Sequence, residues 1–261
     1  MNQCLRRERC PTATNPSRFH RKELRNIGAG RARAFRDAGA DLALTYFDAK
    51  AEPFVRPLAE ALSCPIILPC NVEKPGALDA VFDRIERDWG RLDFALHSNA
   101  FAPAADLHGR VADCSPEGFA RAMDISVHSF IRMAKRAEKL MDKGGALLSM
   151  SYYGAEKVVD HYNLMGPVKA ALEATTRSLS AELSGSGIRV NSLSPGPIKT
   201  RAASGIAHFD ALMEKAVAKA PSHRLTTIDE VGAMAAFLVS DSARSVTGDI
   251  LYIDGGYHVI D

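Results

Sequence analysis

Short apolar runs alternate with longer amphipathic stretches from about residue 28 to the end of the chain. In residues 76–89, apolar side chains recur every three or four positions, which predicts a helix with one buried face. Residues 167–183 are rich in Ala, Leu and Glu, which favour the helical conformation. The apolar runs have the length of buried strands. There are six of them, at residues 41–46, 65–70, 92–97, 145–150, 188–193 and 249–254.

This alternation of strands and helices predicts an α/β fold. We expect a single doubly wound, Rossmann-type domain over residues 28–261, with a parallel sheet covered by helices on both faces. No repeat, low-complexity linker or change of composition divides that range. The chain has 261 residues, of which 46% are hydrophobic and 25% charged, so it can bury a core of this size.

Residues 1–27 form an atypical basic segment that departs from this pattern. They include seven Arg or Lys, two prolines and no apolar run long enough for a strand. A Rossmann-type sheet normally begins with a strand that leads into a glycine-rich turn, which holds a cofactor pyrophosphate at a helix N-terminus. We therefore expect the first strand to be missing and the turn to be atypical.

Gly28-Ala29-Gly30 is the nearest match to that turn, and two interpretations of it remain open. The glycines either hold the pyrophosphate or only open or interrupt a helix that continues through Phe35. A basic, acid-poor start also allows an organelle presequence as a minority interpretation. A displaced start or a local reading-frame change before about residue 30 is a further hypothesis.

The charge balance and the cysteines bear on partners and compartment. Thirty-three Lys and Arg against 31 Asp and Glu leave a formal net charge of +2, which gives no electrostatic basis for binding nucleic acid or a membrane surface. The sequence contains no run of 18 apolar residues, so it predicts no membrane span. No apolar stretch follows the N-terminal charges, as a secretory signal would require. The five cysteines contain no CxxC pair, which favours a reducing compartment. We expect a cytoplasmic protein without a metal site, whose substrate enters a pocket.

The segment 149–169 carries the most informative chemistry. It begins at the end of a predicted strand, and ligands of doubly wound sheets bind at such carboxyl ends. Tyr162 and Lys169 are seven residues apart, so on one helix they share a face at about 10 Å separation. The lysine would favour the phenolate and can hold a ribose diol, while the phenol donates to an oxygen that becomes negative. For an isolated pair, a core tyrosine with a surface lysine is the simpler interpretation.

Further motifs accompany this pair, at residues 96–103, 151–156, 162–169, 189–198, 200–206 and 254–256. On these motifs the chain resembles the short-chain dehydrogenase/reductases over roughly residues 28–261. Within them it is similar to the enoyl-acyl-carrier-protein reductases of bacterial fatty-acid synthesis, which the Tyr-x6-Lys spacing marks. Most short-chain dehydrogenases place the active tyrosine four residues before the lysine, where this chain has Met165, which cannot donate a proton.

The resemblance implies Tyr152, Tyr162 and Lys169 as catalytic residues. Tyr162 would stabilise a thioester enolate, Lys169 would bind the nicotinamide ribose, and Tyr152 would line the acyl pocket. The implied reaction is the NADH-dependent reduction of a trans-2-enoyl thioester, in which hydride attacks the carbon beta to the carbonyl. The implied partner is an enoyl substrate on acyl carrier protein, and a homo-oligomer, a tetramer, is expected by the same resemblance.

The resemblance also implies a set of residues for NAD. Asn71, where the family usually has Asp, keeps an amide oxygen for the adenine amino group. Asp48 favours NADH over NADPH, although Lys50 leaves the second cofactor open. The cofactor-binding residues expected are Asn71, Val72, Ser98, Asn99, Ala100, Lys169, Pro195, Ile198 and Thr200.

Two other interpretations stay open beside the reductase. A degenerate family member would keep the fold and the oligomer contacts while the atypical segment 1–27 impairs cofactor binding. A carbonyl-reducing dehydrogenase is disfavoured by Met165.

Overall fold

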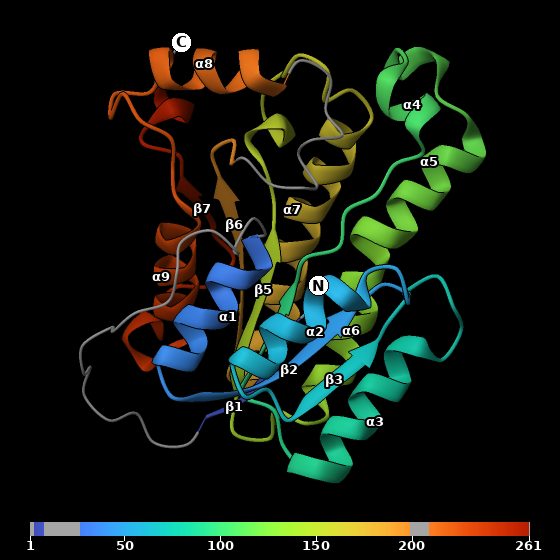
Figure 1. Cartoon of the computed structure of the whole chain (residues 1–261), viewed down its shortest axis with the longest axis vertical. Coiled ribbons are helices and arrows are strands. Elements are labelled where there is room, and N and C mark those ends of the chain that lie inside the picture. Colours follow the sequence, from blue (N-terminus) through green and yellow to red (C-terminus); the bar gives the residue numbers. More distant parts are fainter. Residues whose placement is uncertain (1–2, 8–26, 199–208, 261) are drawn as a thin grey trace.

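The computed structural model describes residues 3–7, 27–198 and 209–260. Within them a seven-stranded sheet has the order β3-β2-β1-β4-β5-β6-β7, and every neighbouring pair except those of β1 is parallel (Figure 1). All six predicted strands are present, which confirms the doubly wound α/β prediction. The strands are β1 (Gln3–Arg7), β2 (Ala40–Tyr46), β3 (Ile66–Pro69), β4 (Phe94–His97), β5 (Gly145–Met150), β6 (Ile188–Pro195) and β7 (Ile250–Ile253).

Helices cover the sheet, and most of them connect successive parallel strands. Their bounds are α1 (Ile27–Asp37), α2 (Glu52–Ala61), α3 (Ala77–Trp89), α4 (Ala104–His108), α5 (Pro116–Met123), α6 (Ser129–Glu138), α7 (Met165–Leu183), α8 (Phe209–Lys219) and α9 (Ile228–Val239). A π-helical turn, η2 (Asp124–His128), joins α5 to α6, and a 3-10 turn, η3 (Tyr153–Ala155), follows β5. Among the described residues, no helix is long and apolar enough to cross a membrane.

The prediction that residues 1–27 hold no strand is wrong. Residues 3–7 form β1 in the centre of the sheet, between β2 and β4. The strand is antiparallel to both, with Gln3 opposite Leu44 and Leu96, and Arg7 opposite Ala40. The pattern of side chains did not predict it, because a central strand is held by backbone hydrogen bonds on both sides, which any non-proline sequence can make. Its carboxyl end consequently lies at the edge where the parallel strands begin.

The core lies in two layers, one on each face of the sheet. Alternate residues of a strand point to opposite faces, so neighbouring positions of one strand enter different layers. Leu42 and Leu44 pack with α1 and α9, whereas Ala43 between them packs with α3 and α6. The helix predicted over 76–89 is confirmed as α3, whose predicted apolar face is buried. Glycines at positive φ flank it, with Gly76 at 76° and Gly90 at 69°.

The two glycines in α1 belong to a helix, and Gly30 lies against α9. A Cβ at Gly30 would lie 2.1 Å from Ile228 Cγ2 and 2.9 Å from Ile228 O. A Cβ at Gly232 of α9 would in turn lie 2.8 Å from Gly30 O. This close approach of α1 and α9 supports the interpretation of Gly28 and Gly30 as helix glycines, with packing as the reason for Gly30.

Gly30→Ala is therefore expected to destabilise the protein. The added methyl overpacks the α1–α9 contact, at a cost of about 1–3 kcal/mol in the free energy of unfolding. Urea denaturation followed by circular dichroism measures the loss. Gly185→Ala is the matched control, because nothing lies within 4 Å of a Cβ at that position. Equal stability of the two variants would contradict the packing role.

Candidate active site

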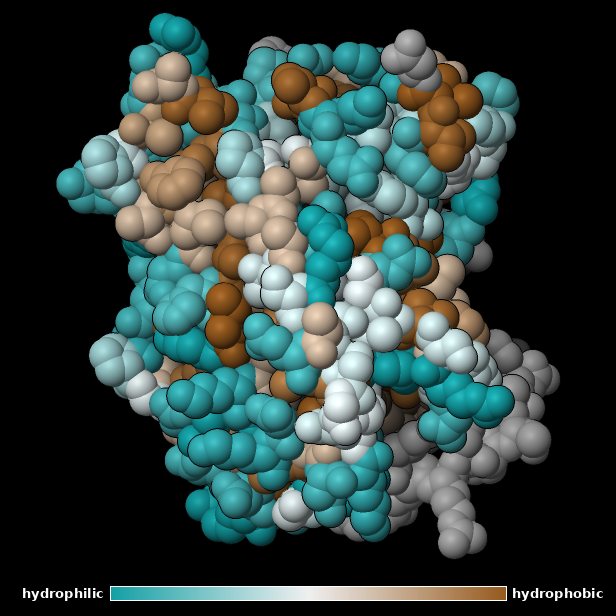
Figure 2. Space-filling view, turned by 180° about the vertical axis from the view of Figure 1, so that it is seen from behind, coloured by the Kyte–Doolittle hydropathy of each residue, from teal (hydrophilic) through white to brown (hydrophobic). Residues whose placement is uncertain are grey.

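The carboxyl ends of the parallel strands bring the predicted site residues to one edge of the sheet. β4 ends at His97, β5 at Met150 and β6 at Pro195, each just before or within a predicted motif. In Figure 1, α4 and α8 lie beyond these strand ends. Figure 2 shows the molecule from behind, and its upper half, where α4 and α8 lie, carries more hydrophobic surface than its lower half. The edge thus combines polar strand ends with nearby apolar surface.

Tyr162 lies in the turn before α7, not on that helix. α7 begins at Met165, and the residues on either side of Tyr162 have positive φ, 62° at His161 and 37° at Asn163. A right-handed helix needs negative φ, so the prediction that Tyr162 and Lys169 share a helix face is wrong. The turn directs Tyr162 into the protein, where only 9% of the residue is exposed.

Two neighbours from the end of β5 hold the Tyr162 ring. The Tyr152 ring meets it edge to face, with 4.8 Å between the ring centroids. A Cβ at Gly154 would lie only 2.4 Å from Cδ1 of Tyr162, so the backbone of η3 touches the ring directly. The structure therefore brings Tyr152 and Tyr162 together as the resemblance implies.

Burial keeps both phenols protonated. It raises the pKa of Tyr162 well above its ordinary value, and the nearby Tyr152 and Glu173 raise it further. Burial likewise raises the pKa of Tyr152, with a smaller contribution from Tyr257. Burial thus acts against the phenolate that Lys169 was expected to favour. The Tyr162 phenol is a neutral hydrogen-bond donor.

Lys169 is buried on α7 at the end of β5. It is 4% exposed, and its Nζ donates a hydrogen bond of 2.6 Å to the carbonyl oxygen of Met150. Burial lowers the pKa of Lys169 to about 8, while the Glu173 carboxylate acts in the opposite direction. The ammonium is therefore close to its titration point near neutral pH, at the strand end where the resemblance expects the nicotinamide ribose.

A cavity of about 310 Å³ gathers the residues predicted for the adenosine end of the cofactor. It lies where β2, β3 and β4 end, and Tyr46 and Phe47 from the end of β2 also line it. The predicted residues among its lining are Asn71, Val72, Ser98, Asn99 and Ala100.

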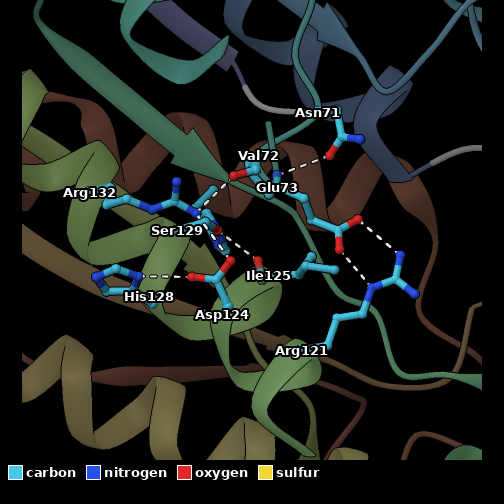
Figure 3. A network of polar contacts seen from close by, with 10 residues as sticks. Asn71, Val72, Glu73, Arg121, Asp124, Ile125, His128, Ser129 and Arg132 are labelled. Atoms are coloured by element: carbon cyan, nitrogen blue, oxygen red, sulfur yellow. Dashed lines mark hydrogen bonds and ion pairs between the residues drawn. The ribbon is translucent and has the colours of Figure 1, made fainter. Parts of the chain in front are cut away.

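Two arginines fasten the loop after β3 to α5 and α6 (Figure 3). Arg121 donates to both carboxylate oxygens of Glu73 at 2.6 and 3.0 Å, and its guanidinium lies 4.5 Å above the Phe101 ring centroid. Arg132 donates to the carbonyl oxygen of Val72 at 2.9 Å and pairs with Asp124 at 3.6 Å. The wall of the cavity is thereby held by side chains that the sequence patterns did not single out.

Removing Arg121 should loosen this wall. Arg121→Ala deletes the bidentate pair and the cation–π contact, so we expect the Kd for NADH to rise about three- to tenfold. The kcat at saturating NADH should not change, because Arg121 lines the cavity at β2–β4, whereas Tyr162 lines a different cavity. Fluorescence titration measures the affinity, and Arg84→Ala, which removes the exposed Arg84–Asp88 pair of α3, is the control. A Kd equal to that of the control would contradict the role.

Asn71 and Asp48, which were expected to contact the adenosine part of the cofactor, also form hydrogen bonds within their own turns. Asn71 Oδ1 accepts from the Glu73 backbone N–H at 3.0 Å, so the oxygen expected to face the adenine amino group already has one donor. Asp48 Oδ1 accepts from the N–H groups of Lys50 and Ala51 at 2.9 and 3.0 Å. Both side chains thus stabilise the loops that border the cavity.

The remaining predicted cofactor residues follow β6. Pro195 ends that strand, and Ile198 is 7% exposed and packs in the core layer of α1 and α9. Gly196 between them donates its N–H to Ile253 O at 2.9 Å, which ties the turn to β7. Thr200 lies outside the described residues.

The residues present fit the two ends of a dinucleotide. The cavity at β2–β4 gathers the residues expected for an adenosine, and the buried Lys169 ammonium lies on the same edge, at the end of β5. The segment that would meet the pyrophosphate precedes α1 and lies outside the described residues. Because β1 runs in the opposite direction, its own carboxyl end lies at the other edge of the sheet.

A second cavity of about 400 Å³ adjoins Tyr162. Val111, Val158 and Pro167 give it an apolar wall, and Val158 is fully exposed. Glu156, Lys157 and Asn163 also line it, so the cavity presents both apolar and polar side chains beside Tyr162.

Sequence reasoning missed one charged residue beside the catalytic candidates. Glu173 on α7 is 4% exposed and accepts a hydrogen bond from Ser151 Oγ. Its spacing of four residues from Lys169 was a signal, since residues four apart lie on one helix face.

A doubly wound sheet with a buried tyrosine and lysine at its carboxyl edge defines a short-chain reductase. The chain belongs to the enoyl-(acyl carrier protein) reductase family, whose model matches residues 23–258. It is 46% identical over 236 residues to enoyl-[acyl-carrier-protein] reductase [NADH] 1 of Rhizobium meliloti, covering 90% of this chain and 87% of that protein. It is 43% identical over 237 residues to the NADH enzyme of Aquifex aeolicus, covering 90% and 88%.

Solved structures show the same likeness. The reductase of Anaplasma phagocytophilum in complex with NAD superimposes with a TM-score of 0.87 at 43% identity, covering 90% of each chain. The Bacillus cereus enzyme with NADP+ and indole naphthyridinone superimposes with a TM-score of 0.88 at 41% identity, covering 91% of this chain and 93% of that one.

Proposed function

We propose that this protein is an NADH-dependent enoyl-acyl-carrier-protein reductase. It reduces a trans-2-enoyl thioester to the saturated acyl thioester in fatty-acid biosynthesis. The observation that carries the proposal is the neutral, buried phenol of Tyr162, packed against Tyr152 at the same sheet edge as the buried Lys169. Family membership and the names of the relatives support it.

Tyr162 supplies the electrophilic assistance in this proposal. NADH, when bound, supplies the hydride that goes to the carbon beta to the thioester carbonyl. Negative charge then develops on the carbonyl oxygen, and a positioned O–H donor stabilises this charge more strongly than it stabilises the uncharged substrate carbonyl. The carbon alpha to the carbonyl then takes a proton from solvent, which completes the saturated thioester. The raised pKa of Tyr162 keeps the phenol protonated and able to donate. Tyr152 holds the ring edge to face and so limits its rotation.

Lys169 and the cavity residues hold the cofactor in this proposal. The Lys169 ammonium has three donors, of which the Met150 carbonyl accepts one, so it can also bind ribose hydroxyls. Asn71, Val72, Ser98, Asn99 and Ala100 border the adenosine, and Pro195 and Ile198 turn the chain near the nicotinamide. NADH is favoured over NADPH because the acidic Asp48 follows Phe47, which lines the cavity, and because the relatives are named as NADH enzymes. The Bacillus cereus structure, by contrast, was solved with NADP+.

The test is the oxidation of NADH by a crotonyl thioester. Purified protein is mixed with NADH and with crotonyl-acyl carrier protein or crotonyl-coenzyme A, and loss of nicotinamide absorbance is followed. We expect turnover with NADH that exceeds turnover with NADPH. Folded protein that consumes neither cofactor would overturn the proposal.

A second candidate is a family member that no longer turns over. It is favoured by one observation, the reversed direction of β1, which removes the usual strand from the pyrophosphate edge. Absence of NADH binding in a titration of folded protein would support it.

The proposal includes a homotetramer in the cytoplasm. The resemblance to the family supports the tetramer. The cytoplasm is supported by Cys64, Cys70 and Cys114, which are free thiols, as is usual in a reducing compartment. Light scattering after gel filtration measures the assembly, and a monomer would contradict it.

A further inference from the structure

Two charged residues of α7 hold successive residues at the end of β5. Lys169 Nζ donates to the Met150 carbonyl oxygen at 2.6 Å, and Ser151 Oγ donates to Oε1 of Glu173. Lys169 and Glu173 are one helical turn apart, and each is 4% exposed. Because the next residue in the chain is Tyr152, these two bonds fix the strand end that carries it.

Glu173 is also an electrostatic partner of the site. Buried charges are costly unless an opposite charge or hydrogen bonds compensate them. Glu173 raises the pKa of Lys169, against the effect of burial, and Lys169 lowers that of Glu173. Burial is the largest influence on Glu173 and raises its pKa, while the Ser151 hydroxyl lowers it.

We propose that Glu173 is a positioning residue of the reductase site, which keeps Lys169 cationic for the cofactor ribose and, through Ser151, holds Tyr152 against Tyr162. The inference rests on the proposed function, because it assigns Lys169 to the ribose. It extends that function by adding a carboxylate that touches neither substrate nor cofactor.

Burial lowers the pKa of Lys169 to about 8, so this ammonium titrates within the range of about pH 7 to 10. Burial also lowers the pKa of Arg31, whose Nη2 donates to Ser98 Oγ at 2.9 Å, to about 9. His97 faces Lys169 from β4, but burial lowers the pKa of His97 to about 3, so it stays neutral. Tyr162 and Tyr252 face Glu173, and burial raises the pKa of both. Glu156 and Arg177 also act on Glu173, with opposite signs.

The sign of the pH effect follows from these neighbours. The protonated Lys169 binds ribose, so NADH affinity declines as the pH rises through the pKa of Lys169 near 8. Glu173→Gln removes the carboxylate that favours the cation, so this midpoint moves to lower pH. A shift of about one unit makes NADH binding about tenfold weaker at a pH well above both midpoints.

The experiment is a fluorescence titration of the full-length protein with NADH from about pH 6 to 10. Glu173→Gln should lower the midpoint by about one unit, and Glu173→Asp, which keeps the charge, should restore most of it. Glu182→Gln, an exposed carboxylate on the same helix, is the matched control and should keep the wild-type midpoint. Lys169→Arg should abolish the midpoint, because arginine does not titrate in this range.

Loss of structure alone would lower the melting temperature without moving the pH midpoint. Folded Glu173→Gln with the wild-type midpoint, or a midpoint that survives in Lys169→Arg, would overturn the inference. Ser151→Ala tests the second part independently, since it leaves the carboxylate in place. We expect it to lower kcat about three- to tenfold at an unchanged midpoint, and an unchanged kcat would overturn that part. If wild-type protein binds no NADH, the proposed function fails together with the inference.

Discussion

Tyr162→Phe should lower kcat for crotonyl thioester reduction by about 100- to 1000-fold. A single preorganised donor to a developing oxyanion is worth about this factor. The Phe ring keeps the edge-to-face contact with Tyr152 and the contact with Gly154, so the pocket keeps its shape. The affinity for NADH should change less than about threefold, because the phenol acts on the acyl oxygen. Steady-state kinetics and NADH titration separate the two effects.

Tyr153→Phe is the control for this variant. Tyr153 is buried beside the site and its ring meets those of Tyr252 and Tyr257 edge to face, so the substitution removes a neighbouring phenol from the same segment. It should keep kcat within about twofold. Tyr162→Phe with wild-type kcat would refute the role given to the phenol.

Lys169→Met should weaken NADH binding about 10- to 100-fold. Hydrogen bonds from a charged donor contribute about 1.5–3 kcal/mol, and the variant removes those expected to the ribose. Methionine fills a similar volume without charge, so the effect is not a cavity. Fluorescence titration at pH 7 measures the loss, and affinity equal to that of wild type would contradict the role of Lys169.

Combined with Glu173→Gln, the same variant should be more stable than the wild type. Burial lowers the pKa of Lys169 to about 8, against about 10.4 in an unfolded chain, so the unfolded state binds the proton more tightly. This group therefore destabilises the fold below about pH 8, and the penalty disappears as the pH rises toward about 10. Replacing both buried groups should raise the free energy of unfolding by about 1–3 kcal/mol at pH 7, measured in urea, because neither charge is then left without its partner. A less stable variant would show that the Met150 bond outweighs desolvation.

The conformation of the turn that carries Tyr162 and the pKa of its phenol could not be predicted from the sequence. The spacing of Tyr162 and Lys169 singled out two residues that the structure buries near the carboxyl end of β5, but it placed them on one helix. Positive φ at His161 and Asn163 breaks that helix, and neither residue is a glycine that would indicate it. The lysine was expected to favour the phenolate, whereas burial, together with Tyr152 and Glu173, raises the pKa of Tyr162.

The grouping of residues at the cavity at β2–β4, by contrast, could be predicted from the sequence. Asn71 and Ser98 are far apart in the chain, yet each follows a parallel strand, so the topology alone predicts that they meet. The arginines that fasten this wall could not be predicted in the same way. Arg121 and Glu73 are 48 residues apart, and their pairing depends on how α5 lies against the loop after β3.

The sequence by itself determined the α/β class, the six parallel strands and the edge at which the site forms. Hydrophobic periodicity and the alternation of strands with helices along the chain are local properties, which the sequence records directly. Tertiary structure alone decided the direction of β1, the turn that carries Tyr162, the protonation of its phenol and the pairing of Glu173 with Ser151. Each of these depends on backbone pairing or desolvation by residues distant in the chain, which local patterns do not record.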